Sequence, residues 1–118
     1  TMIPRPVEWT HFMEADRAFF ASQGGDANIG GRVPLLYEQA GLEIVEILPT
    51  LKICRPGSPT WKWITDYFLG VLDRLAAFPP SNAEEATRFR AHWLAAQKKK
   101  TSIMIAPTLV DVVGRKPK

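Results

Sequence analysis

Apolar side chains return every three or four residues in three segments of this chain, which is the spacing of one buried helix face. The pattern predicts helices over about 6–23, 58–78 and 81–98, and a shorter helix over about 29–40. Their predicted buried faces are Trp9, Phe12, Met13, Phe19 and Phe20 in the first helix, Trp61, Ile64, Phe68, Leu72 and Leu75 in the third, and Ala86, Phe89, Trp93 and Ala96 in the fourth.

Residues that favour helix ends lie at the limits of these segments. Pro6 suits the first position of a helix, where its missing N–H costs nothing, and Ser58 before Pro59 predicts another helix start. Ser81 followed by Glu84 is the pattern of a capping box. Gly41 suits the left-handed position that follows a helix end.

Two segments, about 42–54 and 103–113, are rich in β-branched and other apolar residues and predict strands. Pro49 removes one ladder donor, so we expect a bulge or bend there. The 103–113 segment is apolar without alternation, which is typical of a strand covered on both faces in the middle of a sheet. Such a strand needs a neighbour on each edge, and the sequence contains only one other good strand, 42–54.

Composition indicates one domain over 1–118, with 46% hydrophobic residues and a small basic excess of 15 Lys and Arg over 12 Asp and Glu. This excess is too weak to predict a nucleic-acid partner, and the Lys98–Lys100 run is most simply a solvated helix end. Cys54 is the single cysteine and has no Cys/His spacing around it, so we expect no disulfide and no metal site. No apolar run reaches membrane-spanning length, and we expect a cytoplasmic protein without a membrane partner.

Several short sequences occur in an order that resembles the end of a class I S-adenosylmethionine-dependent methyltransferase. They are Gly24-Gly25-Asp26-Ala27-Asn28-Ile29-Gly30-Gly31-Arg32-Val33-Pro34, Ala40-Gly41-Leu42, Pro56-Gly57-Ser58-Pro59 with Trp61 and Trp63, and Val112-Val113-Gly114-Arg115-Lys116-Pro117. The resemblance covers nearly the whole chain.

This resemblance implies an α/β fold, locally α+β: the C-terminal part of a seven-stranded doubly wound sheet with about four helices. It assigns 42–54 to strand six and 103–113 to the antiparallel strand seven, with a helical insertion at about 58–98. The family binds S-adenosylmethionine on a glycine-rich turn after strand one and an acidic residue ending strand two, and neither has a match here. The glycines at 24–31 follow no predicted strand and lack the dinucleotide-binding order, so we assign no cofactor-binding residue.

Methyl transfer depends mainly on holding the acceptor in line, with a base where the acceptor is a hydroxyl. No catalytic residue is assigned, because a lone histidine more often faces solvent or forms a structural bond. His11 is the better candidate of the two histidines, since it lies just after the exit of strand five in the family-like layout. The candidate acceptor-binding residues are aromatic: Trp9, Phe12, Trp61, Trp63 and Tyr67. Helical spacing favours a core position for Trp61, whereas Trp63 projects from another side of the helix.

We therefore expect the acceptor-side fragment of a methyltransferase for a small molecule, without the cofactor-binding half and inactive alone. The unpaired edge of 103–113 predicts a homodimer. The alternative is a free-standing α+β module that binds a small apolar ligand or a protein partner. A reading frame that extends upstream into a strand and a glycine-rich turn would favour the fragment.

Overall fold

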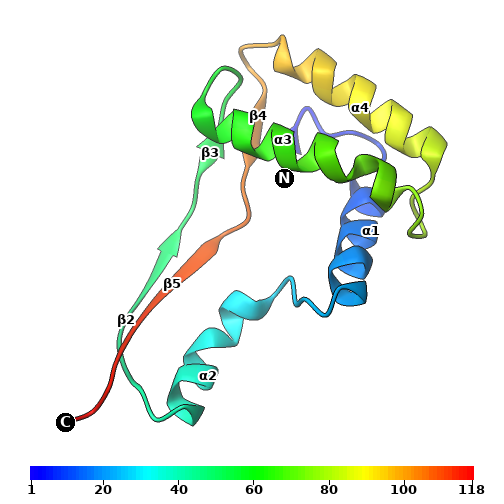
Figure 1. Ribbon diagram of the computed structural model, residues 1–118. Coiled ribbons are helices and arrows are strands. Elements are labelled where there is room, and N and C mark those ends of the chain that lie inside the picture. The colour runs from blue at the N-terminus through cyan, green and yellow to red at the C-terminus, as the bar shows by residue number, and fades with distance from the viewer.

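The computed structural model describes all 118 residues as a mixed α+β chain with four α-helices and two small antiparallel sheets. Figure 1 shows the helices and strands in place. In chain order the elements are β1 (Met2–Ile3), α1 (Trp9–Ser22), the 3-10 helix η1 (Ile29–Gly31), α2 (Val33–Gln39), β2 (Glu43–Thr50), β3 (Ile53–Cys54), α3 (Pro59–Leu75), α4 (Ala83–Gln97), β4 (Ile103–Ile105) and β5 (Leu109–Arg115).

The core is aromatic and lies between α1, α3 and α4. Phe12 stacks on Phe89 with ring centroids 4.3 Å apart, and Phe68 meets Phe12 edge-on at 5.1 Å. Trp61 and Trp93 stack at 5.1 Å. The predicted buried stripes of α3 and α4 are all buried, which confirms the periodicity reading for these two helices.

The two long helices begin on side-chain caps. The Ser58 hydroxyl accepts a hydrogen bond from the Trp61 amide at 3.2 Å, as predicted. At α4 the predicted cap is wrong by one residue, because Asn82, not Ser81, caps the helix by accepting from the Glu85 amide at 3.0 Å. The Ser81 amide instead donates to the Phe78 carbonyl in the turn between the helices.

The helices α1 and α2 differ from the prediction mainly in where they begin. The first helix begins at Trp9 instead of Pro6, whose carbonyl accepts from the Trp9 amide in the preceding turn. The predicted 29–40 helix divides into η1 and α2. Gly41 has φ +75°, as its predicted left-handed position requires.

Each predicted long strand divides into two strands that belong to different sheets. The 42–54 segment becomes β2 and β3, and the 103–113 segment becomes β4 and β5. β4 is the central strand of the sheet β1–β4–β3, whereas β2 pairs only with β5. The prediction of one continuous 103–113 strand was wrong because Pro107, which lacks an N–H, lies in a break between the two sheets.

The β2–β5 pair is a long antiparallel arm. Its register runs from Glu43 opposite Arg115 to Thr50 opposite Leu109, with a bulge between Ile44 and Glu46. Helix α2 packs against the arm, and the Tyr37 ring lies directly over Gly114. The distal edge of β5 has no partner strand, whereas β4 is paired on both edges, so only the β5 part of the predicted free edge is free.

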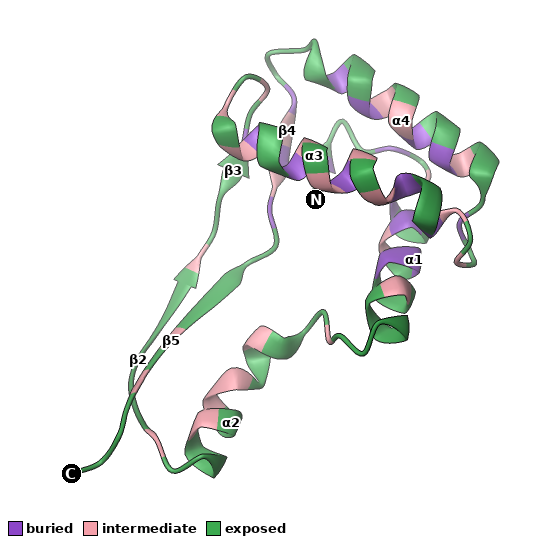
Figure 2. Cartoon of the chain, viewed as in Figure 1, coloured by how far each residue is buried: buried purple, intermediate pink, exposed green.

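The molecule is open in shape. Its radius of gyration is 17.1 Å, against roughly 13 to 14 Å for a compact domain of this length. In Figure 1 the arm reaches away from the three long helices, and α2 lies toward its far end. Figure 2 shows buried residues concentrated in α1, α3 and α4 and around β4, while the arm is almost wholly exposed. A seven-stranded doubly wound sheet is not present: the five strands form two sheets.

Candidate functional site

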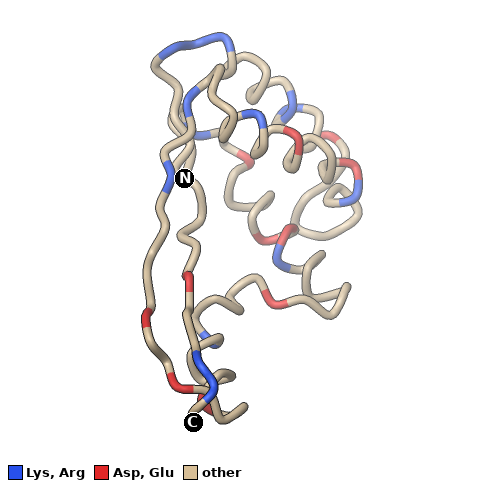
Figure 3. The backbone as a smooth tube through the Cα atoms, turned by 60° about the vertical axis from the view of Figure 1, so that its left-hand side comes forward, with Lys and Arg blue, Asp and Glu red and all other residues tan.

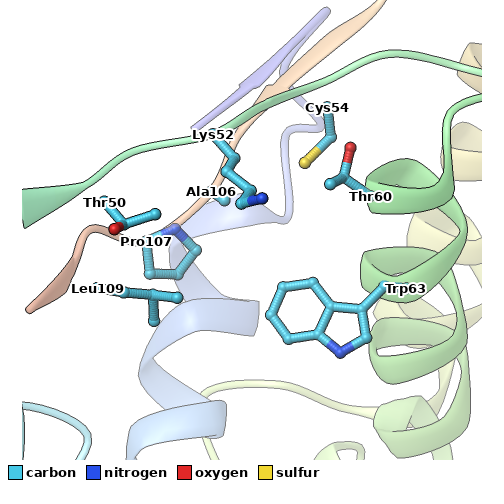
Figure 4. A pocket seen from close by; sticks show the side chains of 8 residues that line it. All are labelled: Thr50, Lys52, Cys54, Thr60, Trp63, Ala106, Pro107 and Leu109. Atoms are coloured by element: carbon cyan, nitrogen blue, oxygen red, sulfur yellow. The ribbon is translucent and has the colours of Figure 1, made fainter. Parts of the chain in front are cut away.

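A small apolar pocket lies where the arm joins the helical body. We call it the bend pocket, and it is drawn in Figure 4. It is bounded by the bend between β2 and β3, the start of α3, and the bend between β4 and β5. Its lining residues are Thr50, Lys52, Cys54, Thr60, Trp63, Ala106, Pro107 and Leu109.

The two strand bends that form the pocket are held side by side. The Ala106 amide donates a hydrogen bond to the Lys52 carbonyl at 3.0 Å, which joins one bend to the other. Next to this bond, the Ile105 amide donates to the Thr1 carbonyl, and the Thr1 ammonium donates to the Ile105 carbonyl. These bonds fix the backbone of the two bends, which contain Lys52 and Pro107.

Trp63 forms one wall of the pocket. It is 60% exposed, whereas Trp61, two positions earlier in α3, is 2% exposed. Two positions along a helix differ by about 200° in direction, so the two indoles lie on nearly opposite sides of α3. Figure 4 shows the Trp63 ring projecting from α3 into the pocket.

Lys52 is the only charged residue of the pocket lining, and its ammonium takes part in none of the ion pairs of the structure. Figure 4 shows its side chain extending from the β2–β3 bend into the pocket, which Trp63 enters from α3. Both pocket hydroxyls are engaged elsewhere. Thr50 donates to Asp111 at 2.8 Å, and Thr60 is hydrogen-bonded to the Ser58 hydroxyl at 3.1 Å. The Lys52 ammonium and the Trp63 indole N–H are therefore the side-chain donors of the pocket lining that have no hydrogen-bond partner.

Cys54 lies at the back of the pocket with a fully buried side chain and a free thiol. Its exposed fraction is 0%, so the thiol packs as a small apolar group behind the cavity.

Three of the predicted acceptor-binding residues lie in the core, away from this pocket. Trp9, Phe12 and Trp61 are at most 5% exposed and pack against the other aromatic rings. The structure brings only Trp63 of the five candidates into the pocket.

Tyr67, the remaining aromatic candidate, bridges α3 and α1. Its hydroxyl donates to the Asp16 carboxylate at 2.8 Å. Burial raises the pKa of Asp16, although the bond from Tyr67 opposes part of that rise. Burial, followed by the neighbouring Asp16 carboxylate, also raises the pKa of Tyr67. This pair joins two helices within the partly buried layer around the core.

His11 does not reach the pocket either. Its Nδ1 lies 2.9 Å from Glu85 Oε1, which joins α1 to α4, and neither helix contributes to the pocket lining. The second carboxylate oxygen of Glu85 is buried without a partner. His92, the other histidine, lies 3.0 Å from the Pro4 carbonyl through Nε2. Both imidazoles are thus engaged in contacts between elements.

The glycine-rich segment at 24–31 does not fit a cofactor loop. It follows α1 and leads into η1, so the strand that a nucleotide-binding turn requires before it is missing. Asp26 holds this turn by accepting bonds from the Asn28 amide and the Arg32 guanidinium, which lower its pKa. The segment is a helix-connecting turn.

Of the eight lining residues the sequence predicted only Trp63, and Lys52, Pro107 and Leu109 are among those it missed. Lys52 and Pro107 are breaks in otherwise apolar segments, and each was visible as such. What the sequence alone did not indicate is that the two breaks lie at the same level, which the antiparallel pairing of Thr50 with Leu109 and of Ile53 with Ile105 imposes.

Other classes of site have little support. No group of three or more His, Cys, Asp or Glu residues is arranged to hold a metal ion. None of the helices combines the length and the apolar character needed to cross a bilayer. Figure 3 shows Lys and Arg scattered over the molecule, with acidic residues among them.

Comparison with known protein families, curated proteins and solved structures finds no match for this chain.

Proposed function

We propose that this chain is the C-terminal, acceptor-side part of a class I S-adenosylmethionine-dependent methyltransferase and does not catalyse transfer by itself. The observation that carries the proposal is β5: a strand without a partner on one edge, paired antiparallel with β2 on the other. In the family this position belongs to the last strand, which lies between two neighbours.

The surface of the arm supports this proposal. A strand that lies at the surface of a folded protein is normally polar on its outer face. Both faces of this arm instead expose large apolar side chains. A further strand and covering helices would bury them. The exposed apolar residues of α2, β2 and β5 are Leu35, Leu36, Ile44, Val45, Ile47, Leu48, Leu109, Val110 and Val113.

The element order also supports it. A short helix leads into β2, the paired helices α3 and α4 follow, and β5 returns antiparallel to β2. This is the order that the resemblance implies for strand six, a helical insertion and strand seven. In such a protein the separate cofactor-binding part brings the methyl donor, and the residues of this chain bind and orient the acceptor.

The bend pocket gives this chain a place for the acceptor. It lies between the insertion helix α3 and the arm, with the apolar faces of Trp63 and Leu109 open to a ligand. An apolar wall beside a fixed backbone can position a ligand, which is a contribution that methyl transfer needs from the acceptor side.

We further propose that the isolated chain forms a homodimer along β5. With two β5 strands antiparallel and centred on Val113, Asp111 of one copy lies opposite Arg115 of the other, twice in the symmetric pair. Opposite charges across a strand pair are favourable, and an unpaired edge is a template for another strand.

The gene upstream of the Thr1 codon tests the methyltransferase proposal. We expect an in-frame segment that encodes a strand followed by a glycine-rich turn, and we expect the longer protein to bind S-adenosylmethionine. Calorimetry on the 118-residue chain alone should detect no binding of this cofactor. A stop codon in frame directly upstream, or micromolar affinity of the chain alone, would contradict the proposal.

The second candidate is a free-standing α+β module that binds a small apolar ligand. The bend pocket favours it, because the pocket is formed wholly within this chain. An initiation site at Met2, with ligand binding and a monomeric state, would favour this module over the fragment.

A further inference from the structure

The bend pocket combines an apolar wall with a single cation. Trp63 is 60% exposed and Leu109 is 52% exposed, so both present apolar area that a ligand would cover. Pro107 and Ala106 add further apolar surface. Covering such area with a flat apolar group is favourable, and an indole face favours a stacked ring.

The polar side chains favour a ligand with one anionic group. The Thr50 and Thr60 hydroxyls already have partners, and the pocket lining contains no carboxylate. Lys52 has no counter-ion in any ion pair of the structure. Lys52 is exposed, so its ammonium attracts a carboxylate as a partly solvent-screened cation beside the apolar wall.

We propose that a small planar aromatic acid binds at the mouth of the bend pocket, whose cavity of about 60 Å³ is too small to enclose a ring. Its ring would lie against the exposed face of Trp63 and its carboxylate on the Lys52 ammonium. As the acceptor class of a methyltransferase this assignment rests on the proposed function, whereas the binding itself does not. Figure 4 shows the two side chains projecting into the same space from α3 and from the β2–β3 bend.

Binding of 2-naphthoate and of its neutral analogue 2-naphthamide to the 118-residue chain tests this assignment. Titrations followed by the indole N–H resonances in NMR distinguish Trp63 from the other three tryptophans, which are all at most 5% exposed. We expect naphthoate to shift the Trp63 resonance and to bind about tenfold more tightly than naphthamide, because only the acid engages Lys52.

Two variants and one control separate the roles of ring and charge. Lys52→Met keeps the apolar stem and removes the charge, so it should weaken naphthoate about tenfold and leave naphthamide unchanged. Trp63→Leu should weaken both compounds. Lys62→Met is the control, because Lys62 is an exposed lysine of α3 that pairs with Asp66 outside the pocket lining. It should weaken neither compound.

Three results would overturn the assignment: equal affinity for the acid and the amide, no loss on Lys52→Met, or no shift of Trp63 at millimolar ligand. Thermal melts of the variants show whether each is folded, and exposed Trp63 and Lys52 are positions where we expect no loss of folding. Because binding is read without cofactor, its failure leaves the proposed function standing. Conversely, failure of methyl transfer by the longer protein leaves an observed binding intact.

Discussion

At the residue scale, the same residue type has opposite surroundings at neighbouring positions. Trp61 and Trp93 are stacked in the core, whereas Trp63 is exposed at the bend pocket. The Trp93 indole N–H donates to the Thr65 hydroxyl at 2.9 Å, so this buried ring also has its polar atom satisfied. Burial therefore decides which tryptophan supports the fold and which is available to a ligand.

Truncation of Trp93 should be far more costly than truncation of Trp63. We expect Trp93→Ala to lower the free energy of unfolding by about 3 to 5 kcal/mol, because it leaves a cavity in the aromatic core. Trp63→Leu, the matched exposed position, should change it by less than about 0.5 kcal/mol. Urea unfolding measures both, and similar losses for the two variants would contradict the placement of these rings.

Asp16 should make stability depend on pH. Its folded pKa lies above the ordinary value of 3.8 because of burial, so the folded state binds more protons than the unfolded state just above that value. The free energy of unfolding therefore has a contribution that is fully present below pH 3.8 and is lost as the pH rises through the folded pKa.

Asp16→Asn should remove this contribution and keep an acceptor for the Tyr67 hydroxyl. Urea unfolding at a series of pH values measures the slope. Above pH 3.8, we expect the slope of the free energy of unfolding against pH to be more positive in the variant than in the parent. An unchanged pH dependence would show that Asp16 is not desolvated as the structure places it.

At the element scale, the buried faces of α3 and α4 were predicted well and strand ends were not. In α1 only Trp9 and Phe12 of the five predicted residues are buried. The stripe from Trp61 to Leu75 could be read from spacing alone because every member faces one core. The division of 103–113 at Pro107 could not, since a break between sheets depends on which partner each half finds. The same reason explains which pocket residues could be predicted. Trp63 could be identified from its position on the helix, whereas Lys52 is placed in the pocket only by the pairing of the two bends.

The cap of α4 offers a test of one helix end. Asn82→Ala should cost about 1 kcal/mol of stability, because the Glu85 amide loses its acceptor. Ser81→Ala, one residue earlier, should cost less, since the Ser81 side chain caps nothing. Chemical unfolding compares the two, and a larger loss at Ser81 would restore the capping box that the sequence predicted.

The contact of α2 with the arm depends on Gly114. A Cβ at this position would lie 2.6 Å from the Tyr37 ring, so Gly114→Ala should displace Tyr37 and loosen α2. Gly31→Ala is the control, because a Cβ there meets nothing within 4 Å. We expect faster amide exchange over α2 in the first variant only. Unchanged exchange in Gly114→Ala would mean that α2 does not rest on β5.

At the scale of the whole molecule, the open shape and the bare arm are the features to explain. The helical body has a complete aromatic core, whereas the arm exposes apolar side chains and the outer edges of β2 and β5. A chain of this kind is most stable when another strand covers β5. We therefore propose that β5 is an interior strand, completed in the proposed methyltransferase by the rest of the sheet or, in the isolated chain, by a second copy.

Sedimentation equilibrium of the 118-residue chain at micromolar concentration tests this claim most directly. Val113→Lys is the matched variant, because the new ammonium lies opposite Glu46 within the arm and opposes approach of a second β5 edge. We predict a species of twice the 13.2 kDa chain mass for the parent and of one chain mass for the variant. A monomeric parent would contradict the claim that β5 needs a strand beside it.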